Sequence, residues 1–418
     1  MMFKKKTCRM CGGKKFKTVI NFGKNALVNS LIERDDLHKK EKVYPLIVEQ
    51  CQDCSLVQIV NSIDSNKIYK DEDYLYFSGD MPGLQDYFAE FVKELHQYIE
   101  HPNDLVMEIG SNDGAMLQHW ATQIGVSCRV LGVDPASNVV VRALKGNIPT
   151  ISDFFTERLA KSIRKEWGQA KIIGGANCIA HLNDLHDMMR GVKHLLKDDG
   201  VFWVECNYWG GMVENKNYSL IYHDHFSYFT LKNWMTFLDK FDMKVFDAYV
   251  TPAQGGSLRI FACNKSEEKM PTDRMIKLLN KEEKTRLNSY KTAKKYNKEV
   301  IEEAGKLNEL ITEIKEQGKT IAGYGAAAKG FSVLKLAEID GTHIDYFIDD
   351  SPAKQGKFTP VTHIPVISRA EASKQLPDYF FITAPNYEKV IIDKEHTFLE
   401  EGGKFITVDS RTIGPDVN

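Results

Sequence analysis

The sequence predicts an α/β protein with a central doubly wound parallel sheet, a small N-terminal module that carries paired cysteines, and a C-terminal Rossmann-like domain. Three observations lead to this prediction. Residues 104–206 alternate short apolar strands with amphipathic helices, as parallel βαβ units do. A second glycine-rich turn between a strand and a helix begins near residue 323. Two C-x-x-C pairs lie within the first 54 residues.

The length of 418 residues allows two or three domains of about 150 residues each. We expect an N-terminal module over 1–75, a central domain over 76–265, and a helical linker with the C-terminal domain over 266–418. The linker is charged, and its apolar residues recur at helical spacing over roughly 265–317, which predicts an amphipathic helix.

The composition excludes several classes of protein. The formal net charge is -2, so no overall field attracts nucleic acid or an anionic membrane. The first lysines are not followed by an apolar stretch, which argues against a signal peptide. No apolar run reaches the roughly 18 residues of a membrane helix. We therefore expect a soluble cytoplasmic protein with no nucleic-acid or membrane partner.

The paired cysteines are Cys8 with Cys11 and Cys51 with Cys54. Two-residue spacing lets both sulfurs of a pair point at one ion, so two pairs predict a tetrahedral thiolate site for zinc. All four ligands then come from the protein, which makes the zinc structural. The alternatives are small core residues or a redox dithiol. The other cysteines lie in apolar, strand-like contexts and are expected in the core: Cys128, Cys178, Cys206 and Cys263.

The central domain opens with a strand, a glycine turn and a helix in DLVMEIGSNDGAMLQ, residues 104–118. Glycines let the backbone approach a ligand, and the free N–H groups of a helix N-terminus can bind it. The pattern E-x-G-x-x-x-G departs from the dinucleotide pattern G-x-G-x-x-G. It resembles the first motif of class I S-adenosylmethionine-dependent methyltransferases. The residues expected to bind this cofactor are Glu108, Gly110, Asn112 and Gly114.

The next strands also end in polar residues. Asp134 closes the second strand, where a carboxylate suits ribose hydroxyls. Asp153 and Phe154 follow the third strand and suit the rim of an adenine ring, and Asn177 and His181 follow the fourth. Spacing alone does not separate S-adenosylmethionine from NAD. A glycine turn that serves only packing is the remaining alternative.

The C-terminal stretch KTIAGYGAAAKG contains a second glycine motif, G-x-G-x-x-A. Its residues are Gly323, Gly325 and Ala328. The following strand ends in Asp349 and Asp350, so this part could hold NAD. It could equally cradle the phosphates of another nucleotide, with Lys329 as the counter-charge. Both possibilities stay open on spacing alone.

The decapeptide IYHDHFSYFT, residues 221–230, follows the strand VFWVEC, and ligands gather at the carboxyl ends of such strands. Histidine is the side chain best able to accept a proton near neutral pH. In an extended segment Tyr222 and Asp224 share one face, and His223 and His225 share the other, whereas a sharp turn would break this alternation. The alternatives are structural hydrogen bonds, or a metal site for which H-x-H lacks a third ligand.

Taken together, these motifs resemble the nucleotide-sugar C-methyltransferases of branched deoxysugar biosynthesis, the sugar C-3 methyltransferases. The resemblance covers essentially the whole chain and rests on the C-x-x-C pairs, YLYFSGDMPG, EIGSNDG, ANCIAHLND, IYHDHFSYFT, QGGSLRI, GYGAAAKG and IDDSPAKQGKFTPVTHIPV. It implies an N-terminal zinc module, a central S-adenosylmethionine domain and a C-terminal Rossmann-like domain that closes over a nucleotide-diphosphate sugar. It also implies a monomer.

The same resemblance implies roles for individual residues. His225 matches the catalytic base, and Tyr222, His181 and Tyr76 match positions that line the sugar site, although a core aromatic is the alternative for Tyr76. The family has glutamate between the two histidines, where this chain has the shorter Asp224. The residues expected to contact the substrate are Ser78, Gly79, Arg259 and Lys329. For the arginine, which suits a phosphate, a salt bridge within the protein is the alternative.

The implied chemistry is carbon methylation through an enolate. A carbon next to a ketone is weakly acidic, so its proton needs a positioned base and a donor to the enolate oxygen. His225 would take the proton, and Tyr222 or His181 would donate to the oxygen. The carbanion then attacks the sulfonium methyl, with no metal at the active centre.

Three other functions compete with this one. NAD in the C-terminal domain would make the protein a nucleotide-sugar oxidoreductase or epimerase. A sugar O- or N-methyltransferase would need no base strong enough to form an enolate. A scaffold role would leave the tyrosine–histidine cluster without a purpose. The sequence leaves open the nucleotide, the sugar and the stereochemistry.

Overall fold

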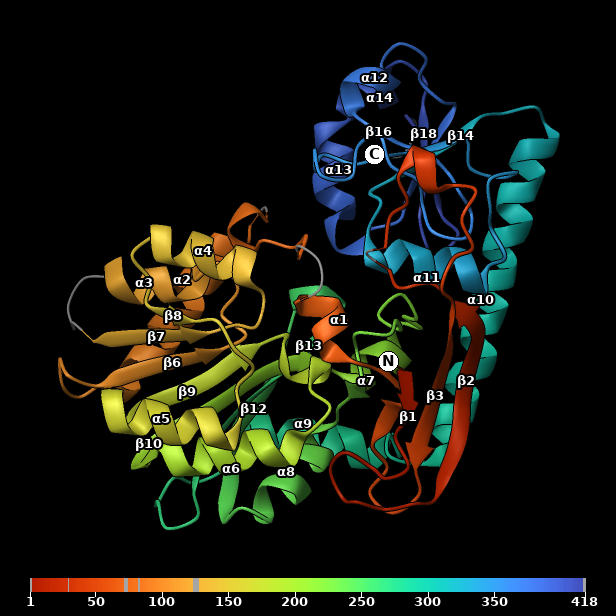
Figure 1. The fold of residues 1–418 in the computed structure, drawn as a ribbon. Coiled ribbons are helices and arrows are strands. Elements are labelled where there is room, and N and C mark those ends of the chain that lie inside the picture. The colour runs from red at the N-terminus through yellow and green to blue at the C-terminus, as the bar shows by residue number, and fades with distance from the viewer. Residues whose placement is uncertain (1, 29, 71–73, 82, 123–127, 416–418) are drawn as a thin grey trace.

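The computed structural model describes residues 2–28, 30–70, 74–81, 83–122 and 128–415. Two mostly parallel α/β sheets, a four-stranded antiparallel sheet and a separate two-stranded pair form the described part of the fold (Figure 1). The α/β fold class predicted from the sequence is therefore confirmed.

The central sheet has seven strands in the order β12-β13-β10-β9-β6-β7-β8. Its pairs are parallel except those of β13, which runs antiparallel to both β10 and β12. The chain adds β7 and β8 on one side of β6 and then crosses to the other side with β9, so the order of the strands reverses between β6 and β9. Ligands of open α/β sheets bind at such a switch point. The strands are β6 (Leu105–Ile109), β7 (Arg129–Val133), β8 (Thr150–Ile151), β9 (Ala170–Ala176), β10 (Leu196–Asn207), β12 (Met243–Thr251) and β13 (Ser257–Asn264).

Helices cover both faces of this sheet (Figure 1). One face carries α2 (Leu84–Leu95), α3 (Ala115–Thr122) and α4 (Ser137–Lys145), and the opposite face carries α5 (Glu157–Trp167), α6 (Leu185–Leu195) and α8 (Leu231–Asp239). Coverage on both faces explains why β6 reads LVMEI, with every residue buried. The short α7 (Trp209–Glu214) follows β10.

The N-terminal sheet is antiparallel and has the strand order β11-β4-β3-β2. Its strands are β2 (Phe16–Asn25), β3 (Tyr44–Cys51), β4 (Val57–Ile59) and β11 (Ser227–Tyr228), and β1 (Met2–Lys4) pairs separately with β5 (Asn61–Ile63). The helix α1 (Ser65–Tyr69) follows. Strand β11 lies within the decapeptide of residues 221–230, just after its histidines. Because β11 pairs with β4, the decapeptide is attached to the N-terminal sheet.

The C-terminal sheet has six strands in the order β16-β15-β14-β17-β18-β19, all parallel except β19. They are β14 (Ile321–Tyr324), β15 (Tyr346–Ile348), β16 (Val366–Ile367), β17 (Tyr379–Ile382), β18 (Lys404–Ile406) and β19 (Thr412–Ile413). The helices are α11 (Ala328–Leu336), α12 (Arg369–Ala372), α13 (Glu388–Lys394) and α14 (His396–Glu400). This doubly wound order is Rossmann-like, as predicted.

The linker expected as one helix contains two, α9 (Asp273–Lys284) and α10 (Tyr290–Glu316). Arg286 has a positive φ of 52° that ends the first helix. The Ser289 side chain then accepts the N–H of Thr292 and caps the second. Figure 1 shows α10 running beside the N-terminal sheet and the C-terminal domain.

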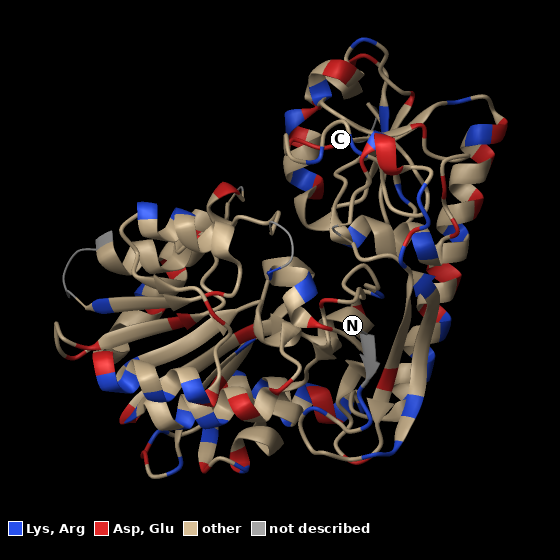
Figure 2. Ribbon diagram, viewed as in Figure 1, with Lys and Arg blue, Asp and Glu red and all other residues tan. Residues whose placement is uncertain are grey.

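Basic and acidic residues are interspersed along α10 and over α5 and α6 (Figure 2), in line with the net charge of -2. Within the described part of the chain, no helix combines the length and the apolar character needed to cross a membrane.

Candidate active site

The glycine turn after β6 forms at the switch point of the central sheet. Gly110 has a φ of 67° and Gly114 a φ of 78°. A Cβ atom at Gly110 would lie 2.4 Å from that of Cys178, so a larger residue would collide with the loop after β9. Asn112 lies between the glycines, and its N–H donates to Asp134 at 2.9 Å. The turn therefore joins the carboxyl ends of β6, β7 and β9.

Two buried carboxyl groups lie beside this turn. Asp134 accepts the N–H groups of Asn112 and Ala136, both at 2.9 Å, yet burial raises its pKa to about 6. Burial, with further effects of Asp134 and Asp113, raises the pKa of Glu108 well above its usual value. Glu108 Oε2 has no hydrogen-bond partner among the described residues. Buried acceptors of this kind favour a ligand with hydroxyl or ammonium donors.

The ends of β8 and β9 add further polar groups. Asn177 has a φ of 55°, and its Oδ1 is buried with no hydrogen-bond partner among the described residues. The Asp153 carboxylate accepts the Phe154 N–H at 2.9 Å and the Lys70 ammonium at 3.2 Å. S-adenosylmethionine carries ribose hydroxyls and an ammonium group, so these strand ends fit it.

Residues 74–81 lie against the glycine turn. The Ser78 N–H donates to Asn112 Oδ1 at 2.8 Å, and the Asn112 amide donates to the Tyr76 carbonyl at 3.0 Å. The Gly79 N–H donates to the Asp113 carboxylate at 3.0 Å. Ser78 and Gly79, expected at the substrate, thus contact the glycine turn through their backbone in this structure.

His225 is held at both ring nitrogens. The Leu220 carbonyl lies 2.7 Å from Nδ1. Because a carbonyl only accepts, Nδ1 carries the hydrogen of the neutral ring and Nε2 keeps a lone pair. The Tyr222 hydroxyl donates to Nε2 at 2.8 Å. The Asn207 Nδ2 lies 3.0 Å from Nδ1, but two N–H groups do not bond to each other, so the shorter contact to the Leu220 carbonyl fixes the ring hydrogen. This is the tautomer that a general base needs at Nε2.

His181 lies beside His225, with ring centroids 4.9 Å apart in an edge arrangement. Nδ1 of His181 is hydrogen-bonded to the Tyr69 hydroxyl. Burial lowers the pKa of His181 to about 4. Burial, followed by the effects of His181 and Lys329, lowers the pKa of His225 well below its usual value. Both rings are therefore neutral at neutral pH.

Residues 222–225 form a turn, which is the second of the two conformations considered for this segment, so the alternation of an extended strand does not apply. The N–H of His225 donates to the Tyr222 carbonyl at 3.0 Å, and their ring centroids lie 4.0 Å apart. His223 instead contacts the N-terminal module, where its Nε2 lies 3.3 Å from the Tyr44 carbonyl. A turn brings together residues three apart, and the two histidines do not share a face.

Asp224 lines a separate cavity of about 460 Å³, together with Val28, Tyr74 and Gln355 among others. The aspartate is buried, and no hydrogen bond joins its carboxyl group to another described residue. Burial raises its pKa to about 7. The carboxyl group is thus poised between its neutral and charged forms near neutral pH.

Arg259 contacts protein groups. Its Nε and Nη2 donate to Glu205 at 3.0 and 2.6 Å, and further N–H groups donate to the hydroxyls of Tyr87 and Tyr249, both at 2.7 Å. The guanidinium carbon lies 3.5 Å from the ring centroid of Phe91. These bonds use four of its five N–H groups. Because an internal ion pair accounts for Arg259, we assign it no phosphate.

A cavity of about 750 Å³ lies between the central domain and the C-terminal domain. Its lining includes Tyr76, Asn177, Gln254 and Tyr387. Lys329 donates from α11 to Gln254 Oε1 at 2.6 Å. Burial lowers the pKa of Lys329 to about 7. Among the described residues no carboxylate forms a salt bridge with this lysine, so a bound anion would favour its charged form.

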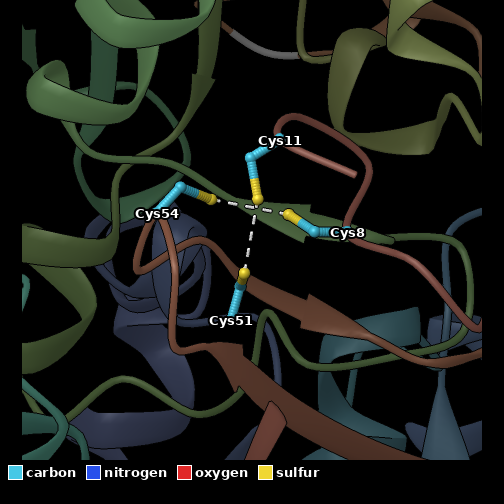
Figure 3. A group of neighbouring side chains, drawn as sticks. All are labelled: Cys8, Cys11, Cys51 and Cys54. Atoms are coloured by element: carbon cyan, nitrogen blue, oxygen red, sulfur yellow. Dashed lines mark hydrogen bonds between the residues drawn. The ribbon is translucent and has the colours of Figure 1, made fainter. Parts of the chain in front are cut away.

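The four cysteines of the C-x-x-C pairs converge on one point (Figure 3). Their Sγ atoms lie within 4.8 Å of one another, and the pairs Cys8–Cys54 and Cys11–Cys51 are 3.5 Å apart. Tetrahedral zinc with bonds of about 2.3 Å places its sulfurs about 3.8 Å apart. The cluster therefore fits a zinc ion held by four thiolates.

The two cysteine loops share one backbone geometry. The carbonyl of Cys8 accepts the N–H of Gly12 at 3.0 Å, and that of Cys51 accepts the N–H of Ser55 at 2.9 Å. Gly12 and Ser55 both have positive φ, of 76° and 66°. Two matching knuckles of this kind are typical of structural zinc sites.

Sequence reasoning missed three groups of this site. Asn207 ends β10, so the strand-end rule that selected Asn177 could have found it. Leu220 acts through its backbone carbonyl, which no side-chain pattern reveals. Tyr69 meets His181 across 112 positions of sequence, and only the folded chain brings them together.

Models of known protein families match three successive parts of the chain. A model described as a zinc binding domain matches residues 8–69, one described as a methyltransferase domain matches residues 83–247, and one described as a C-methyltransferase C-terminal domain matches residues 252–408.

The chain is also similar to individual proteins. The plantazolicin methyltransferase BpumL with bound SAH is 14% identical, with a TM-score of 0.35 over 44% of this chain and 85% of that one. Magnesium protoporphyrin IX methyltransferase of Synechocystis PCC 6803 is 14% identical, with a TM-score of 0.33 over 48% of this chain and 89% of that one. The C-methyltransferase NovU of Streptomyces niveus is 32% identical over 400 residues, which cover 96% of this chain and 94% of NovU. With this identity over nearly its whole length, the chain belongs to the family of S-adenosylmethionine-dependent C-methyltransferases.

Proposed function

We propose that the protein methylates carbon 3, beside the ketone, of a nucleotide-diphosphate 4-keto deoxysugar. The observation that carries this proposal is the contact of the buried His225 with the half-buried Tyr222, in which a neutral imidazole meets a hydroxyl donor. Removal of a proton beside a ketone requires both a base and a donor to the enolate oxygen. Methyl transfer to an oxygen or nitrogen forms no enolate, so it needs neither a base strong enough to form one nor a donor to the enolate oxygen.

His225 acts as the base at Nε2. The Leu220 carbonyl keeps the ring hydrogen on Nδ1 and stabilises the imidazolium that forms when Nε2 takes the substrate proton. Burial disfavours an isolated imidazolium. The enolate formed beside it supplies the opposite charge, so base and product of this step stabilise each other.

Tyr222 donates to the enolate oxygen. Its hydroxyl hydrogen faces His225 Nε2 before substrate binds, and turning it toward the ketone frees the base at the same time. Tyr76, in the wall of the larger cavity, and His181, beside His225, are the other candidates for contact with the sugar.

The carboxyl ends of the central strands hold the methyl donor. Asp134 suits the ribose hydroxyls, the glycine turn lets the ligand approach the backbone, and Glu108 and Asn177 offer unpartnered buried acceptors. Asp153 and Phe154 suit the adenine. When bound, S-adenosylmethionine supplies a methyl group already activated on a sulfonium.

The larger cavity is the proposed place of the nucleotide-diphosphate sugar. Lys329 in its surroundings suits the diphosphate, whose charge would restore that of the ammonium. We further propose that residues 1–75 act as the zinc module, 76–265 as the cofactor domain and 266–418 as the linker and sugar-nucleotide domain of a cytoplasmic monomer.

At the competing NAD site, both acidic residues named from the sequence are paired with lysines in the described chain. Asp349 accepts Lys354 Nζ at 2.9 Å, and Asp350 accepts Lys394 Nζ at 2.7 Å. Lys354 also donates to the Ala326 carbonyl of the glycine loop at 3.1 Å, so a ribose that bonded to Asp349 would have to displace it. We therefore favour a sugar nucleotide over NAD for the C-terminal domain.

The test is product analysis after incubation with methyl-¹³C-labelled S-adenosylmethionine and 4-keto sugars of thymidine, cytidine and guanosine diphosphate. We expect one of them to gain a labelled methyl group whose NMR couplings place it on carbon 3. A methyl on oxygen or nitrogen, or no transfer together with tight NADH binding, would contradict the proposal.

A further inference from the structure

A buried arginine connects the first cysteine knuckle with both histidine segments. Arg9 lies between Cys8 and Cys11 and is 2% exposed. Its Nη1 donates to the Phe226 carbonyl at 3.3 Å, and its Nη2 donates to Asn183 Oδ1 at 3.1 Å. We propose that Arg9 is a positioning residue through which the zinc-loaded knuckle sets the placement of His225 and His181. This inference rests on the proposed role of His225.

Phe226 directly follows His225, and its backbone N–H and carbonyl groups are both hydrogen-bonded. Its N–H donates to the Ala180 carbonyl at 2.8 Å, and its carbonyl accepts the Ile59 N–H at 2.9 Å as well as Arg9. The Arg9 guanidinium carbon lies 5.0 Å from the centroid of the Phe226 ring. A shift of Arg9 therefore moves the backbone that carries the base.

Asn183 holds the other histidine segment. It lies two residues after His181 and accepts the second arm of the Arg9 guanidinium. The same Nη2 also donates to Ser62 Oγ at 2.6 Å, which ties the arginine to β5. One planar group thus contacts the segments of both histidines, adding to the direct bond from the Phe226 N–H to the Ala180 carbonyl; the two histidine rings are 4.9 Å apart.

The charge of Arg9 explains why zinc matters for this link. Its hydrogen-bond acceptors are neutral carbonyl, amide and hydroxyl oxygens, and among the described residues no carboxylate forms a salt bridge with it. A buried cation needs a counter-charge. Four thiolates around a divalent ion leave a net negative charge next to Arg9. The loaded knuckle thereby stabilises the guanidinium where it reaches both segments.

The experiment compares Arg9→Met and Arg9→Lys with the control Lys240→Gln in the full-length zinc-loaded protein. Lys240 donates to the Met10 carbonyl at 3.0 Å, so the control disturbs the same knuckle without touching a histidine segment. Zinc per chain, affinity for S-adenosylhomocysteine, and the ring ¹⁵N and ¹H NMR signals of His225 and His181 are measured together with kcat.

We expect both Arg9 variants to keep one zinc and the cofactor affinity of the wild type, while the ring signals of His225 and His181 shift or broaden. We expect kcat to fall about 10- to 100-fold. Arg9→Lys should rescue little, because an ammonium cannot span both acceptors. Lys240→Gln should leave signals and kcat as in the wild type.

Zinc-loaded Arg9→Met with the histidine signals and kcat of the wild type would overturn the inference. If Arg9→Met fails to fold or loses zinc, Asn183→Ala decides, since it removes only the contact to the His181 segment. Unchanged histidine signals in that variant would overturn the inference too. A wild type that methylates no nucleotide sugar would contradict the proposed function, whereas the NMR comparison would still test Arg9.

Discussion

The Tyr222 hydroxyl lies 2.8 Å from Nε2 of His225, so the proposed base and the proposed enolate donor are hydrogen-bonded to each other before substrate binds. One hydroxyl hydrogen cannot serve the imidazole and the enolate at the same time. Arrival of the ketone therefore has to redirect that hydrogen, and the redirection couples release of the base to stabilisation of the product.

Tyr222→Phe tests this coupling. Without the hydroxyl, Nε2 is free but the enolate oxygen loses a donor, so we expect kcat to fall about 100- to 1,000-fold. Tyr290→Phe is the matched control, because its hydroxyl donates to the Thr18 carbonyl at 2.9 Å and lines neither cavity. Steady-state methyl transfer measures both. A Tyr222→Phe variant as fast as Tyr290→Phe would remove the tyrosine from the reaction.

Asp134→Asn tests the cofactor site. The Asn112 N–H bonds to Oδ2 and the Ala136 N–H to Oδ1, so asparagine keeps only one of these two bonds and also lacks the charge that strengthens bonds to ribose hydroxyls. Charged hydrogen bonds contribute about 1.5–3 kcal/mol, so affinity should weaken about 10- to 100-fold. Calorimetric titration with S-adenosylhomocysteine measures it. Unchanged affinity would place the donor elsewhere.

Arg259→Ala should lower stability rather than substrate binding. The change leaves Glu205 buried without its guanidinium partner, which typically costs about 3–5 kcal/mol. Urea unfolding measures this loss. A variant with wild-type stability and a raised KM for the nucleotide sugar would instead return Arg259 to the phosphate role expected from the sequence.

Asp224→Asn should change how stability depends on pH. The pKa of Asp224 is about 7 in the fold and 3.8 in its ordinary state, so between these values the folded chain keeps a proton that the unfolded chain has lost. The wild type therefore loses stability as pH rises from about 4 to 7, by up to about 1.4 kcal/mol per pH unit.

Asparagine cannot ionise and removes this dependence. The stability of Asp224→Asn relative to the wild type should thus be greater at pH 8 than at pH 5, by up to about 3 kcal/mol. Urea unfolding at both pH values measures the difference. Equal differences at pH 5 and pH 8 would mean that Asp224 is not buried as a neutral acid.

The features of the fold that could be predicted from the sequence are those that depend on a few neighbouring residues. The buried run LVMEI, the glycines at 110 and 114 and the cysteine spacing act over a few residues, so their roles could be inferred locally. The break between α9 and α10 depends on one capping serine in a charged stretch, and periodicity does not detect it. Pairing of β11 with β4 joins distant segments and has no local signal.

In the candidate site, too, residues with a local sequence signal could be predicted, whereas contacts between distant segments could not. Asp134 and Asn177 could be proposed because they end parallel strands. The turn at 222–225 could not, since the sequence YHDH fits an extended strand as well as a turn. The partners of Arg259 come from three separate elements, α2, β10 and β12, so its ion pair with Glu205 is a property of the folded chain.

Proton exchange in heavy water tests the proposed chemistry most directly. The protein is incubated with S-adenosylhomocysteine and a nucleotide 4-keto sugar, and loss of the hydrogen beside the ketone is followed by NMR. His223→Ala, two residues from the base and in contact with the N-terminal module instead, is the control for His225→Ala. We predict exchange at carbon 3 in the wild type and the control, and at least about 100-fold slower exchange in His225→Ala. Exchange of equal rate in His225→Ala, or none in the wild type with any such sugar, would contradict the enolate mechanism.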